Sequence, residues 1–281
     1  MRKSAALVQR PLPSTVRQQP ATDTLPPSRR QPVSQLRAAF LSGMILILLW
    51  QMLVTVAQIP TWLLPGPLAV GARLRTAWLD GTLMQHVVPT VIESIGGFAL
   101  ALLVGALSGY GVAHSRRLER WVAPYIAAAQ AIPVIAVAPL VVIWFGYDSD
   151  VLRNTVIAAI VVVFPIFSST LTGVRTIPRE LREVALVEGA NRRQRLRFIE
   201  LPLALPVLFS GMRTSLAYAT TGAVVGEFVG SRYGLGALIN IARGFWDTPL
   251  IFVALLCLGT ITLLLYLVLI GVERLTLRWL E

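Results

Sequence analysis

The side chains that could take part in catalysis or metal binding are few and scattered in this sequence. The two histidines, His86 and His114, lie far apart, and the single cysteine, Cys257, sits in an apolar run. No HExxH or CxxC spacing occurs, so we predict no metal site and no catalytic residues. The only lysine is Lys3, so the chain has no GxxxxGK[ST] phosphate-binding loop. We therefore expect neither an enzyme nor a bound cofactor.

Charge is concentrated in residues 174–202, which read VRTIPRELREVALVEGANRRQRLRFIELP. This segment contains seven Arg and four Glu, although only 14% of the chain is charged. Because charged side chains are costly to place in lipid, a segment of this kind between two apolar runs must lie in water. It is also large enough to dock a partner protein.

We expect this charged segment to fold as two short helices joined by a glycine. Pro178 suits the first turn of a helix, and an apolar face surrounds Ala185. Gly189 stands where a helix needs a left-handed terminating residue. Asn191 and Gln194 have the spacing of a capping box, which would begin the second helix, with the membrane edge following it.

The rest of the chain has the composition of a helical membrane protein. It is 55% hydrophobic, with a mean hydropathy of +0.69. We predict an all-α fold with a disordered tail at 1–37, rich in Pro and Gln, and a transmembrane domain at 38–281. About six spans of roughly 20 residues are predicted. They are placed at 38–57, 87–113, 121–145, 154–173, 203–229 and 250–272.

Two patterns within these spans predict how they pack. Gly97, Ala101, Gly105 and Gly109 recur at a spacing of four, which allows a second helix to approach closely. The span at 121–145 contains three prolines, and each removes a backbone donor. Such breaks persist in a membrane where protein or water satisfies the freed groups, so we expect this span inside the bundle or along a path.

The distribution of basic residues predicts the orientation. The net charge is +11, which we assign to basic loops rather than to nucleic-acid binding. With six spans, 19 of the 25 Lys and Arg residues fall on the side of the two termini and of residues 174–202, and five fall on the other side. The positive-inside rule then places both termini and the charged segment in the cytoplasm.

Three charged residues lie within or near the ends of predicted spans: Glu93, Arg213 and Glu227. Each costs about 2.5–3.5 kcal/mol at the centre of a membrane helix. They either line a pathway or close a gate, or they form structural pairs near the helix ends.

The charged segment resembles the EAA loop of ABC importer permeases, written EAA-x3-G-x9-I-x-L-P. The matching positions are Glu183, Ala185, Gly189, Ile199, Leu201 and Pro202. Val184 departs from the motif, which has Ala there. Residues 97–113, 132–146 and 226–239 also resemble permeases of the nitrate, sulfonate and taurine class. Glu93, where sulfonate and taurine members usually carry Arg, is more similar to members that serve thiamine-pyrimidine precursors or riboflavin.

The resemblance implies a permease subunit in a bacterial inner membrane. It would pair with a second permease copy and receive substrate from an extracytoplasmic binding protein. The six motif residues would couple it to separate ATP-binding cassette subunits. Import of sulfonate, taurine or nitrate is the alternative substrate assignment. A secondary transporter, which needs inverted repeats and coupling-ion carboxylates, and a membrane enzyme are the competing classes.

Overall fold

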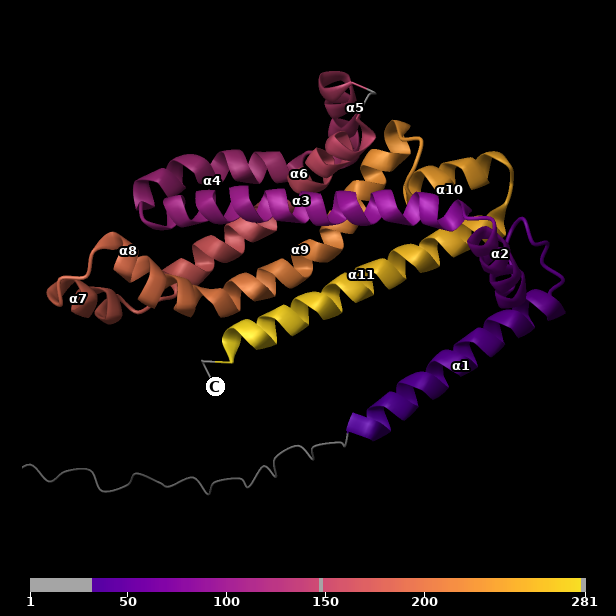
Figure 1. Cartoon of the computed structure of the whole chain (residues 1–281), viewed down its shortest axis with the longest axis horizontal. Helices are drawn as coiled ribbons and strands as arrows, with labels where there is room; N and C mark the ends of the chain where they lie inside the picture. The colour runs from indigo at the N-terminus through magenta and orange to yellow at the C-terminus, as the bar shows by residue number, and fades with distance from the viewer. Residues whose placement is uncertain (1–31, 147–148, 279–281) are drawn as a thin grey trace, which may run out of the picture. The chain divides into compact units, whose positions relative to one another are not determined.

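The computed structural model describes residues 32–146 and 149–278, and every element in these ranges is helical (Figure 1). The predicted tail falls largely on residues 1–31, outside the described ranges. The first helix begins at Pro32, so residues 32–37, which we expected in the tail, are helical. In chain order the elements are α1 (Pro32–Val56), α2 (Pro67–Leu79), α3 (Thr82–Ala113), α4 (Arg116–Ala131), α5 (Val134–Phe145), α6 (Asp150–Arg175), α7 (Arg179–Val187), α8 (Arg192–Arg195), the π-helix η1 (Leu196–Glu200), α9 (Leu201–Gly230), α10 (Leu235–Gly244) and α11 (Thr248–Leu277).

The chain divides into two compact units, residues 1–48 and 49–281. Of the first unit, residues 32–48 are described, and they belong to α1. Its large apolar side chains from Phe40 to Leu48 are exposed. The second unit contains the last turns of α1 and all the other helices.

The core of the second unit is built from α3, α6 and α9, which pack along most of their lengths. The predicted small-residue stripe lies buried at the contact between α3 and α6. A β-carbon at Gly105 would stand 2.7 Å from the carbonyl oxygen of Val163, and one at Gly109 would stand 2.6 Å from that of Phe167. No larger residue fits without moving a backbone, so the stripe allows the close approach that its spacing predicted.

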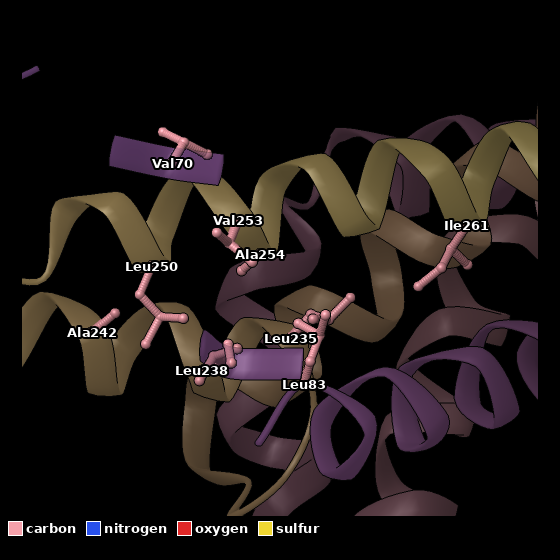
Figure 2. Close-up of a cluster of buried hydrophobic side chains, with 10 residues drawn as sticks. Val70, Leu83, Leu235, Leu238, Ala242, Leu250, Val253, Ala254 and Ile261 are labelled. Carbon is pink, nitrogen blue, oxygen red and sulfur yellow. The ribbon is translucent and has the colours of Figure 1, made fainter. Parts of the chain in front are cut away.

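A second apolar cluster joins α10 and α11 to α2 and to the first turn of α3 (Figure 2). Leu235 and Leu238 of α10 face Val253 and Ala254 of α11, and Leu83 of α3 completes the contact. Residues 58–86 lie between the first two predicted spans. The structure forms α2 there and begins α3 at Thr82.

Three described helices, α3, α6 and α11, are long and apolar enough to cross a membrane. The pair α4 and α5 would add a fourth span if it counts as one, although the two helices meet at 94°. The all-α fold is therefore confirmed, whereas the number of six spans stays a prediction.

The break between α4 and α5 lies at Pro133, which is the N-cap of α5. From there α5 buries Ala138, Val141 and Val142 and packs against α6 and α9. Among its described side chains α4 has none that is buried. The predicted interior position thus holds for α5 but not for α4 within this chain.

Candidate functional site

The charged segment 174–202 begins with α7, whose end is fixed by Gly189. The Gly189 amide donates to the Leu186 carbonyl at 3.1 Å, and the Ala190 amide donates to the Ala185 carbonyl at 2.9 Å. Gly189 has φ +76°, so this is the left-handed helix end that the sequence predicted. Pro178 is the N-cap of α7, one position before the first turn where we expected it.

The second helix of the segment starts with the predicted capping box. The Gln194 amide donates to Oδ1 of Asn191 at 2.9 Å, and the Asn191 amide donates to Oε1 of Gln194 at 2.8 Å. The helical run does not end near Pro202. It continues through α8, η1 and α9 to Gly230.

Pro202 explains the π-helical turn within this run. A proline ring inside a helix clashes with the carbonyl four residues earlier, which here belongs to Phe198, in the middle of η1. A π-turn widens the helix at that point and lets the chain continue. The second helix of the charged segment is thus continuous with α9, whereas α7 is a separate helix.

The exposed face of α7 differs from the predicted one. Ala185 is only 6% exposed and is the one buried residue of α7, so this motif position faces the chain itself rather than a partner. Val184 and Val187 are 60% and 88% exposed, and Glu183 is exposed beside them. The surface available to a partner therefore includes these three residues, together with the exposed side chains of Leu181 and Leu186. Of the other motif positions, Ile199 and Pro202 are half-buried and Leu201 is exposed.

Glu200, which the motif leaves unspecified, ties the segment to α3. Its carboxyl group is buried and accepts a hydrogen bond from the Tyr110 hydroxyl at 2.7 Å. Nε2 of His114 lies 3.3 Å from the same carboxyl group, and the rings of Tyr110 and His114 are 4.5 Å apart. Sequence reasoning missed this cluster because its members are about 90 positions apart and no local spacing connects them.

At the opposite end of the long helices, the structure brings Glu93 and Glu227 into one buried polar cluster. Glu93 lies on α3 and accepts a hydrogen bond from the Asn154 side chain of α6 at 3.0 Å. The same amide nitrogen donates to Oγ of Ser231 at 2.8 Å. Arg153 donates to Ser231 and to the Gly230 carbonyl. These contacts fasten the end of α9 to α3 and α6.

Glu227 holds the turn that leads from α9 to α10. Its carboxyl oxygens accept hydrogen bonds from the Thr90 hydroxyl and from the Gly236 amide, each at 2.5 Å. The Leu235 amide donates to Oγ1 of Thr90 at 2.9 Å, and Nδ1 of His86 lies 2.8 Å from the Gly234 carbonyl oxygen. Of the two readings of Glu93 and Glu227, this geometry favours structural pairing.

Arg213 is separate from this cluster. It lies in the α9 run and pairs with Glu273 of α11, with 3.5 Å between Nε and Oε2. The three charged residues that the sequence grouped as pathway candidates therefore occupy two different places in the fold.

The class of protein follows from these features. Apolar helices long enough to span a bilayer pack through glycines, and a capped helical loop rich in Arg and Glu lies at one end, as in a multi-pass membrane permease. The chain belongs to the family described as the binding-protein-dependent transport system inner membrane component, whose model matches residues 97–280.

Named relatives agree with this family. The riboflavin transport system permease protein RibX of Chloroflexus aurantiacus is 53% identical over 236 residues, which cover 84% of this chain and 87% of the relative. The formylaminopyrimidine transport permease protein ThiX of Halalkalibacterium halodurans is 30% identical, with coverages of 84% and 93%. The taurine transport system permease protein TauC of Escherichia coli is 28% identical, with coverages of 84% and 86%.

Proposed function

We propose that this chain is the membrane subunit of an ATP-driven importer and that it couples to a separate ATPase subunit through α7. The observation that carries the coupling role is the exposure of Val184 and Val187 on a short, firmly capped helix. An exposed pair of β-branched side chains beside Glu183 is the kind of surface that a groove on a partner covers. The ATPase has to be another chain, because the sequence printed here has no phosphate-binding loop.

The attachment of α7 suits the transmission of movement. The helix ends in a rigid Gly189 turn, and the chain then enters the continuous run from Arg192 to Gly230. A displacement of α7 by the ATPase would therefore reach α9 directly, and it would reach α3 through Glu200. A second permease copy, an extracytoplasmic binding protein and the surrounding lipid bilayer complete the proposed assembly.

Replacing an exposed valine of α7 with a charged residue tests the coupling role. Val187→Glu should abolish co-purification of the ATPase subunit and substrate uptake, because it places a charge at the centre of the contact, while the amount of permease in the membrane stays unchanged. Leu79→Glu, at the exposed end of α2, is the matched control and should retain the ATPase. Full ATPase recovery and uptake with Val187→Glu would remove α7 from the contact.

We further propose that the substrate is a small organic nutrient of the riboflavin type. The support is the relative named for riboflavin transport, which is 53% identical over 84% of this chain. The relative named for formylaminopyrimidine transport is 30% identical, which makes a thiamine precursor the second choice. Relatives named for aliphatic sulfonate and taurine transport are 28–30% identical, so that substrate class is an alternative of similar standing to the thiamine precursor.

Uptake measurements distinguish these substrates. The permease is expressed with its cognate ATPase and binding protein in a host that lacks its own riboflavin uptake. Labelled riboflavin, formylaminopyrimidine and taurine are then offered separately. We expect ATP-dependent accumulation of riboflavin alone. Accumulation of taurine without riboflavin would reverse the substrate assignment and leave the coupling role intact.

A further inference from the structure

A groove between α9 and α11 is lined by more basic than acidic residues in the part of the chain that the structure describes. It has a volume of about 780 Å³, and its walls include Arg213 of α9 and Glu273, Arg274 and Arg278 of α11. Arg213 and Glu273 pair with each other at 3.5 Å. Arg274 and Arg278 make no hydrogen bond or ion pair with any residue that the structure describes, and both are exposed. The groove therefore has an excess of two positive charges.

The same groove has an apolar side. Ile270, Arg274 and Arg278 are four residues apart, so they form one stripe along α11 that changes from apolar to basic. Leu277 is half-buried beside them. Leu277 also packs against a buried apolar cluster, in which Phe209 and Met212 of α9 lie with Leu269 of α11. A ligand that fills this groove would need an anionic head and an apolar body.

We propose that this groove binds an anionic phospholipid, with its phosphate held by Arg274 and Arg278 and an acyl chain lying on the Ile270 side. Guanidinium groups bind phosphate oxygens through paired hydrogen bonds, and basic pockets between membrane helices are suited to lipid headgroups. A free phosphate ion would satisfy the two arginines equally well. It would not use the apolar wall, and α11 is itself long and apolar enough to span a membrane. This proposal does not depend on the substrate or on the coupling role of α7.

Native mass spectrometry of the purified full-length protein tests the proposal. The protein is mixed with phosphatidylglycerol or with phosphatidylcholine of the same acyl chains, and bound lipid is counted. We expect phosphatidylglycerol to be retained preferentially. The variant Arg274→Gln/Arg278→Gln should weaken phosphatidylglycerol binding by about 30-fold, since each basic residue near a membrane surface contributes about fivefold.

Two control variants isolate the groove. Arg116→Gln/Arg117→Gln removes the same charge from the exposed start of α4 and should leave lipid retention unchanged. Arg274→Lys/Arg278→Lys keeps the charge but not the paired hydrogen bonds of guanidinium, so it should retain more phosphatidylglycerol than the glutamine variant and less than the wild type. Equal retention of the two lipids, or unchanged retention in the glutamine variant, would overturn the proposal. Release of the bound lipid by millimolar inorganic phosphate would assign the groove to a free anion instead.

Discussion

At the scale of single residues, Tyr110 supplies the shorter of the two side-chain contacts to the buried carboxyl group of Glu200, the other being His114. Tyr110→Phe removes the hydroxyl that donates to Oε2 at 2.7 Å and adds no atoms. An unpaired buried acceptor costs about 1–3 kcal/mol, so we expect the variant to unfold at a lower temperature than the wild type. Thermal unfolding of the purified protein in detergent measures the difference.

Tyr125→Phe serves as the control for this change. Tyr125 lies on α4 and is 73% exposed, so the loss of its hydroxyl should leave the unfolding temperature unchanged. If the two variants unfold at the same temperature, Glu200 does not depend on Tyr110, and its proposed link between α7 and α3 is wrong.

Residue-scale features were predictable where the signal was local. Gly189 and the Asn191–Gln194 box act within three to five positions of the chain, and both were read correctly from spacing. The pairing of Glu200 with Tyr110 spans 90 positions. The contact between Glu227 and Thr90 spans 137. No pattern in the chain encodes such distances, so the side of α7 that is buried and the position of Glu93 had to come from the fold.

At the scale of the helices, the contact between α3 and α6 depends on glycine at defined positions. Gly109→Ala would place a β-carbon 2.6 Å from the Phe167 carbonyl oxygen, so the helices must separate. Overpacking of this kind costs about 1–3 kcal/mol. Gly111→Ala is the matched control on the same helix, because a β-carbon there meets nothing within 4 Å. The alanine at 111 should be neutral or slightly stabilising, because alanine favours helix more than glycine does.

Thermal unfolding of both alanine variants tests this packing. Equal unfolding temperatures would show that α3 and α6 adjust to each other without cost. Sequence reasoning could predict this interface, because a four-residue spacing of small residues marks one helix face. It could not predict that the helix would continue past Pro202 by way of a π-turn. Nor could it predict that α4 and α5 would meet at 94° at Pro133.

At the scale of the second unit, its two ends differ in the number of arginines that they carry. The long helices carry α7 and α8 at one end and α2 and α10 at the other (Figure 1). The first end has the arginines of segment 174–202 and of the α4 start, and the Glu200 contacts join that segment to the end of α3. The second end has Arg73, Arg75, Arg153, Arg232 and Arg243. Because basic loops are retained in the cytoplasm, we expect the α7 end to face inward.

Cysteine labelling tests this orientation in intact cells. In a Cys257→Ala parent, Arg75→Cys on α2 should react with a membrane-impermeant maleimide added outside, and Glu180→Cys on α7 should react only after permeabilisation. Both positions are exposed, so their reactivity reports the side of the membrane rather than burial. The unsubstituted parent, which lacks cysteine, gives the background. The reverse labelling pattern would place α7 outside the cell, where no ATPase could reach it, and would contradict the proposed coupling together with the orientation.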